Sequence, residues 1–156
     1  MKQLLFTIKE NVALTDSVYK MTLSGDTADI KCGQFVNIKL QGLYLRRPIS
    51  VCDCEDGVLT LVYKVVGKGT EQMSQMTEGT LDILTGLGNG YDTSLSSDKP
   101  LLLGGGVGVP PLYKLCKELI SEGKKPSVIL GFNTKDEIFY ENEFKALGAE
   151  VKVTTA

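Results

Sequence analysis

The hydrophobic pattern changes once along the chain, and this change limits the folds that are available to it. From Leu4 to about Leu84, apolar residues form short alternating or β-rich runs that are separated by turn residues. From Pro100 onward, compact apolar runs alternate with helical patterns. Alternating runs are typical of antiparallel strands, whereas compact runs followed by helices are typical of parallel strands. The sequence therefore predicts an antiparallel β unit followed by an α/β unit.

Six strands are predicted in the first unit. They span Leu4–Val12, Val18–Leu23, Phe35–Leu40, Pro48–Cys52, Leu59–Val65 and Leu81–Leu84. Turn segments rich in glycine and aspartate separate them, and six strands at this spacing predict a small antiparallel β-barrel or sandwich. One short helix, Thr70–Met76, is predicted after the sequence Gly67-Lys68-Gly69.

The second unit reads as alternating strands and helices. Strands are predicted at Leu101–Leu103, Ser127–Gly131 and Val151–Thr154, and helices at Pro110–Glu122 and Glu141–Leu147. This βαβαβ order is that of a doubly wound parallel α/β nucleotide-binding domain. The serine-rich stretch 94–99 separates the units, so we predict domains at residues 1–97 and 98–156. Open sheets of this type usually have more strands, so we expect the second domain to be incomplete, or truncated, at its C-terminus.

The composition excludes several kinds of catalytic site. The 156 residues contain no histidine, which excludes Ser-His-Asp and Cys-His nucleophiles and a histidine general base. Any catalysis must therefore rely on a cofactor or a metal cluster. The net charge is −2, which offers no general attraction to nucleic acid or to a membrane surface. Without a signal-peptide pattern or a long apolar run, the sequence predicts a cytoplasmic protein.

The four cysteines show no metal-binding spacing. Cys32, Cys52, Cys54 and Cys116 form no CxxC pair, and disulfides are not expected in a reducing compartment. We predict that they are ordinary buried or partly buried thiols. No metal ligand set is therefore predicted within this chain.

A glycine-rich turn is the strongest sign of nucleotide binding. Residues 104–112 read GGGVGVPPL, and they lie between a predicted strand and a predicted helix. Glycine allows the backbone to approach a phosphate, and free amides at a helix start attract anions. A purely structural turn is the alternative, but proline at the helix start and the preceding buried strand favour a nucleotide site.

Two further features are ambiguous when read separately. Gly67-Lys68-Gly69-Thr70 could hold a diphosphate through its amides and the Thr70 hydroxyl, but a hairpin loop explains it equally well. In Arg46-Arg47-Pro48-Ile49-Ser50, one guanidinium could bind a pyrophosphate. Paired arginines usually face solvent, so this motif alone favours no site.

Taken together, the motifs resemble the ferredoxin-reductase-like flavoproteins. The sequences RRPIS, YKVVGKGT, GLGNG, GGGVGVPPL and GFNTKDEIFYENEF occur in the order found in that family. In detail they are similar to the family of electron transfer subunits, carrying FAD and iron–sulfur, of NAD-linked dihydroorotate dehydrogenases. The resemblance covers nearly the whole chain. It implies an FAD-binding barrel followed by an α/β domain that receives a nicotinamide nucleotide.

The resemblance also implies roles for individual residues. Arg47 matches the arginine that binds the FAD diphosphate, and Ser50 matches the residue near flavin N5, the catalytic position. The residues that match the FAD site are Arg47, Pro48, Ile49, Ser50, Tyr63, Lys64, Val65, Gly69 and Thr70. Those that match the NAD site are Gly104, Gly106, Gly108 and Pro111. Asn133 stands where relatives often have arginine, which favours NAD over NADP.

The electron route follows from the same resemblance. It implies FAD as cofactor, NAD as substrate, and a [2Fe–2S] centre whose cysteine ligands lie outside this chain. The implied partner is an FMN-containing dihydroorotate dehydrogenase catalytic subunit in a heterotetramer that serves pyrimidine biosynthesis. Two alternatives stay open at this point. One is the small subunit of a ferredoxin-NADP reductase or sulfide dehydrogenase complex, and the other is a non-catalytic nucleotide-binding module.

Overall fold

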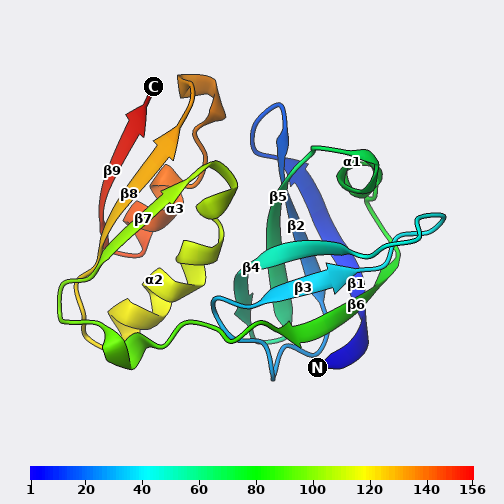
Figure 1. Cartoon of the computed structure of the whole chain (residues 1–156), viewed down its shortest axis with the longest axis horizontal. Coiled ribbons are helices and arrows are strands. Elements are labelled where there is room, and N and C mark those ends of the chain that lie inside the picture. The colour runs from blue at the N-terminus through cyan, green and yellow to red at the C-terminus, as the bar shows by residue number, and fades with distance from the viewer.

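A computed structural model describes all 156 residues and contains a closed barrel beside a parallel sheet (Figure 1). The barrel strands are β1 (Lys2–Ala13), β2 (Val18–Ser24), β3 (Phe35–Ile38), β4 (Arg47–Glu55), β5 (Val58–Lys64) and β6 (Thr80–Leu87). Their order around the barrel is β1-β2-β5-β4-β3-β6, and every neighbouring pair is antiparallel. The predicted six-stranded antiparallel barrel is confirmed.

Apolar side chains at alternate strand positions fill the barrel interior. Inward-facing residues such as Phe6, Met21 and Leu61 are completely buried in one cluster of 16 residues. Because each strand alternates its side chains, the outward positions stay available for other contacts. Helix α1 (Lys68–Ser74) joins this cluster through Met73, which is also completely buried.

The second half is a three-stranded parallel sheet with two α-helices. Its strands are β7 (Leu101–Gly105), β8 (Ser127–Phe132) and β9 (Glu150–Thr155), in the order β7-β8-β9. The helices are α2 (Pro111–Ser121) and α3 (Glu141–Ala146), and short 3₁₀ turns span Thr93–Leu95 (η1), Gly106–Gly108 (η2) and Lys135–Glu137 (η3). This is the predicted βαβαβ order. None of the helices has the length and apolar content needed to cross a membrane.

Both helices pack on one face of this sheet. Leu102 and Leu130 point to that face and share a buried cluster with Leu119 of α2 and Phe144 of α3. The opposite face carries Leu103, which is 69% exposed. Apolar side chains on the inner face therefore attach the helices to the sheet.

Helix α1 differs from its prediction in register. The glycines before Thr70 favoured a start at Thr70, but the helix begins at Lys68 and ends at Ser74. The Thr70 hydroxyl oxygen accepts hydrogen bonds from the backbone N–H groups of Val66 and Gly67, at 2.9 and 3.3 Å. These bonds draw the glycine segment into the first helical turn, against its weak helix propensity.

The barrel and the sheet are joined through α2. Cys52 and Val62 face outward from the barrel and belong to the same buried cluster as the helices. At the edge of this contact, Lys117 of α2 lies 2.9 Å from Asp53 and 2.6 Å from Glu55. An apolar centre with a charged border therefore holds α2 against β4.

Replacing Lys117 tests this border. Burial alone would lower the pKa of Lys117, but its hydrogen bonds to Glu55 and Asp53 raise it, and the same contact lowers the pKa of Glu55. We expect Lys117→Met to lower the free energy of unfolding by about 1 kcal/mol at neutral pH. The stability that the Glu55 ion pair contributes is fully present above the usual pKa of 4.5 and is lost as the pH falls through the lowered pKa of the folded state. Urea unfolding should therefore show a difference between wild type and variant that shrinks in acid; a constant difference would contradict this explanation.

Candidate functional site

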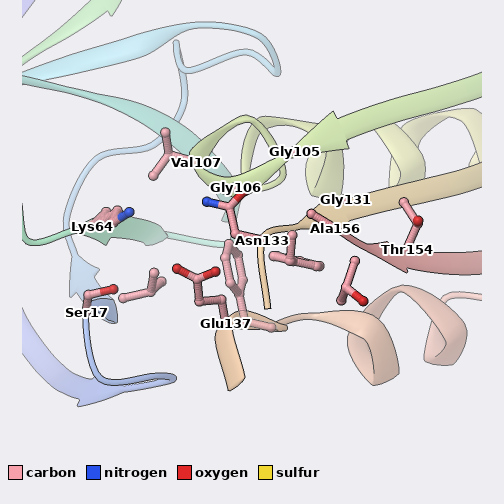
Figure 2. A pocket seen from close by; sticks show the side chains of 14 residues that line it. Ser17, Lys64, Gly105, Gly106, Val107, Gly131, Asn133, Glu137, Thr154 and Ala156 are labelled. Atoms are coloured by element: carbon pink, nitrogen blue, oxygen red, sulfur yellow. The ribbon is translucent and has the colours of Figure 1, made fainter. Parts of the chain in front are cut away.

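A cleft of about 680 Å³ opens between the barrel and the carboxyl ends of the parallel strands. Ser17 and Lys64 lie on its barrel side, while Gly131 and Thr154 come from the sheet and Gly106 from the turn after β7 (Figure 2). The carboxyl ends of parallel strands are where α/β sheets bind their ligands. The cleft therefore combines the expected binding edge of the sheet with a wall supplied by the barrel.

The glycine-rich turn after β7 forms one wall of this cleft. A Cβ atom at Gly104 would lie 2.7 Å from Leu112 Cδ1, so glycine is needed there for the turn to pack on α2. Gly106 has φ +54°, and a Cβ there would meet no atom within 4 Å. Gly104 therefore has a packing role, whereas Gly106 leaves open space that faces the cleft. Gly108 and Pro111 belong to the same turn and helix start, but they do not line the cleft.

One carboxylate projects into the cleft from the segment after β8. Glu137 accepts hydrogen bonds from the Thr134 backbone N–H at 3.0 Å and from the Thr134 hydroxyl at 3.3 Å. The neighbouring Asn133 also lines the cleft. No arginine lines it, and its one cationic side chain is Lys64 on the opposite wall (Figure 2). The segment after β8 therefore presents a fixed negative charge.

The barrel face beside the cleft carries the Ser50 position. Outward-facing positions on β4 and β5 include Cys52 and Val62, which the second half covers. Pro48, Ser50 and Lys64 continue along this outward face, and all three are exposed. Because the η2 turn packs against β5, this exposed strip lies next to the glycine-rich turn. A group bound on the strip would therefore lie close to a ligand in the cleft.

The two adjacent arginines have different environments. Arg46 pairs with Asp82 at 3.0 Å and also donates to the carbonyls of Asn37 and Asp82. Arg47 has no carboxylate partner, and its guanidinium donates only to the Leu45 carbonyl. Arg46 therefore stabilises the barrel, and Arg47 is the guanidinium that is available to an anion.

Arg47 lies directly against α1. A Cβ atom at Gly69 would be 2.7 Å from Arg47 Cγ and would overlap the guanidinium end of that side chain. Gly69 and Thr70 are buried, and Thr70 closes the first turn of the helix. Only glycine at position 69 allows this approach, so the structure brings Arg47, Gly69 and Thr70 together. A half-buried cation beside close-packed backbone is suited to a phosphate group.

Three of the residues that match the FAD site face the barrel interior and not its outer surface. The Tyr63 side chain is 2% exposed inside the barrel, and Ile49 and Val65 pack against the same core cluster. Any contact from these residues to a ligand would use the backbone. The residues matched to the FAD site thus form three groups. Arg47 lies against α1, Ser50 belongs to the exposed outward strip, and Tyr63, Ile49 and Val65 face inward and support both.

Sequence reasoning did not find several residues of the cleft. Ser17 and Thr154 line it but belong to none of the motifs, and Glu137 and Phe139 lie in the GFNTKDEIFYENEF motif but had no role assigned to them. A usable signal existed for Thr154, because a residue at the carboxyl end of a parallel strand is a candidate by position. No such signal existed for Ser17, which comes from the loop between β1 and β2.

The cysteines do not fit an iron–sulfur cluster. All four are buried thiols, as the sequence predicts. Burial raises the pKa of Cys52 to about 12, and burial together with a hydrogen bond to Glu118 raises the pKa of Cys32 to about 12. No group of three or more potential ligands is close enough to hold a metal ion. These thiols are therefore structural, and a cluster has no ligand set among these residues.

Comparisons with known proteins agree with this geometry. The dihydroorotate dehydrogenase B (NAD(+)) electron transfer subunit of Fusobacterium nucleatum subsp. nucleatum is 44% identical over 96% of this chain, and that of Bacillus pumilus is 43% identical over 95%. The chain spans 61% of the length of each of these relatives. No family model matches the chain.

A solved structure extends the comparison to three dimensions. It belongs to an NADH-dependent reduced ferredoxin-NADP oxidoreductase that was studied for flavin-based electron bifurcation, and it superimposes with a TM-score of 0.85 at 31% identity. The match covers 96% of this chain and 56% of that one. The chain thus has the ferredoxin-reductase-like fold and, over nearly its whole length, is similar to electron transfer subunits of dihydroorotate dehydrogenase B.

Proposed function

We propose that this chain is an electron-transfer flavoprotein subunit that binds FAD on the barrel and receives NAD(H) in the cleft. The observation that carries the proposal is Arg47, a half-buried guanidinium without a carboxylate partner, held against α1 at a glycine. This arrangement lies on β4, the strand that also carries the exposed Ser50. The relatives that support the proposal are named as electron transfer subunits.

The residues present fit an FAD diphosphate and flavin ring. Arg47 would bind the diphosphate together with the backbone at Gly69 and Thr70. Ser50 would offer its hydroxyl to the reactive edge of the flavin, and Pro48 would contact the ring from the same strand face. When bound, FAD supplies the redox chemistry. The protein's own contribution is to orient the ring toward the cleft.

The cleft fits a nicotinamide dinucleotide that lacks a 2′-phosphate. The open space at Gly106 would allow the ligand's phosphates to approach the protein backbone, which fits the glycine-rich pattern of nucleotide sites. Asn133 supplies no positive charge, and the Glu137 carboxylate would repel an additional phosphate. We therefore propose NAD rather than NADP as the substrate.

The remaining electron carrier is proposed to lie on a partner. The relatives are subunits of dihydroorotate dehydrogenase B, so we propose an FMN-containing dihydroorotate dehydrogenase catalytic subunit in a heterotetramer. The [2Fe–2S] centre of that electron route would use ligands outside these residues. A second candidate is a ferredoxin-NADP reductase complex, which the 31% identical solved structure favours. Identification of the protein that co-purifies with this chain would separate the two.

Anaerobic reduction tests the proposed function. The FAD-loaded protein is mixed with NADH, and the flavin absorbance is followed. We expect stoichiometric bleaching with NADH and slower bleaching with NADPH at the same concentration. Flavin that stays oxidised with both nucleotides would exclude the proposed reductase. Because the protein in this test already carries FAD, that result would favour the non-catalytic binding module.

A further inference from the structure

Asn11 of β1 connects three parts of the barrel through one amide group. Its Nδ2 donates to the backbone carbonyls of Met73 and Met76, each at 2.8 Å. Its Oδ1 accepts a hydrogen bond from the Tyr63 hydroxyl at 2.9 Å. The amide therefore uses both of its donors at the C-terminal end of α1 and its acceptor on β5. Asn11 belongs to none of the motifs that match the FAD site.

The two carbonyl oxygens fix the direction in which the amide points. Carbonyl oxygens only accept hydrogen bonds, so the nitrogen end of the amide must face Met73 and Met76. The oxygen end then accepts from the Tyr63 hydroxyl, which keeps its proton because burial raises the pKa of Tyr63 to about 12. A carboxylate of the same shape would therefore place an oxygen against two other oxygens.

Helix α1 depends on such contacts because it is too short to be stable alone. It has seven residues, fewer than an isolated helix needs, and its last carbonyls lack partners within the helix. Thr70 fixes its first turn, Met73 anchors it in the core, and Asn11 binds its end. Loss of the Asn11 bonds would free the C-terminal end to move while Met73 stays buried.

Movement of α1 would reach the proposed diphosphate site directly. Gly69 lies on this helix, and Arg47 packs against it closely enough to exclude a Cβ atom. We infer that Asn11 is a positioning residue for the FAD diphosphate, acting through α1 on Arg47 and Gly69. This inference rests on the proposed function, because it assigns Asn11 to the same cofactor site.

The isosteric substitution Asn11→Asp is the sharpest test. Binding constants for FAD and for riboflavin, which lacks the diphosphate, are measured by quenching of flavin fluorescence in the purified protein. We expect FAD to bind about tenfold more weakly, since more than one hydrogen bond is lost and a repulsive contact is formed. Riboflavin affinity should stay within about twofold, because the flavin face on β4 is not moved.

Two control variants separate the loss of the Asn11 hydrogen bonds from non-specific effects of substitution. Asn142→Asp makes the same chemical change on the exposed surface of α3 and should leave both affinities unchanged. Tyr63→Phe removes only the bond to the amide oxygen and leaves both bonds to α1, so FAD affinity should fall less than in Asn11→Asp. If Asn11→Asp does not fold, Asn11→Ala replaces it, because alanine removes the same hydrogen bonds without placing an oxygen against the two carbonyls; a selective loss of FAD affinity is again expected.

The outcomes distinguish this inference from the function on which it rests. An unchanged FAD affinity in Asn11→Asp, or an equal loss for FAD and riboflavin, would overturn the positioning role while leaving the flavin site intact. A selective loss of FAD affinity supports it. Wild-type protein that binds neither compound would overturn the proposed function itself, and this inference with it.

Discussion

Arg47→Ala is expected to weaken FAD binding by about 10- to 150-fold, because a charge-assisted hydrogen bond to phosphate contributes about 1.5–3 kcal/mol. Arg47 has no carboxylate partner to leave behind, so the substitution should cost little folding stability. Arg46, by contrast, is paired with Asp82 and donates to two backbone carbonyls. Titration of the apoprotein with FAD, followed by flavin fluorescence, measures the effect.

Three variants control the Arg47 experiment. Arg47→Lys keeps the charge but loses the planar fork, so its FAD affinity should lie between wild type and Arg47→Ala. Gly69→Ala keeps both charge and fork but displaces the side chain from α1, and it should also weaken FAD binding. Lys145→Ala removes one positive charge on α3, where Lys145 pairs with Glu141, and should have no effect. Equal FAD affinity in Arg47→Ala and wild type would remove Arg47 from the site.

Gly106→Val is expected to slow NADH-driven flavin reduction by about 10- to 100-fold at limiting NADH, while bound FAD is retained. A Cβ atom at this position would meet no protein atom within 4 Å, so the valine side chain would project into the cleft that the nucleotide needs. Its effect should therefore appear in nucleotide binding and not in flavin content. Stopped-flow reduction at several NADH concentrations measures this.

Backbone strain is the competing explanation for Gly106→Val. Gly106 has φ +54°, a conformation that is unfavourable for a β-branched residue. Gly123, just after α2, has φ +84° and equally open surroundings, but it does not line the cleft. Gly123→Val therefore reproduces the strain without the obstruction, and its reduction rate should match wild type. Similar losses in the two variants would assign the effect to strain.

The sequence alone predicts most of this fold because the dominant signals are local. Alternation marks the barrel strands, and compact apolar runs mark the parallel ones, since the two kinds of sheet bury different faces. The helix α1 is the informative exception. Its start at Lys68 depends on a side-chain bond from Thr70 back to the glycine segment, which propensity does not describe.

The candidate site is predictable only in part, because its decisive features are non-local. The family resemblance already selects Arg47, but the physical reason, which is that Asp82 on β6 pairs with the adjacent Arg46, is visible only in the fold. The bond from Asn11 to Met73 joins residues far apart along the chain. Motifs predict which residue types are needed, and packing decides their roles.

Stoichiometric binding of FAD by the purified protein tests the central claim most directly. The apoprotein is titrated with FAD, and bound flavin is quantified after gel filtration. The account predicts a yellow protein with one FAD per chain and an affinity that depends on Arg47. A protein that stays colourless in excess FAD and quenches no flavin fluorescence would contradict it.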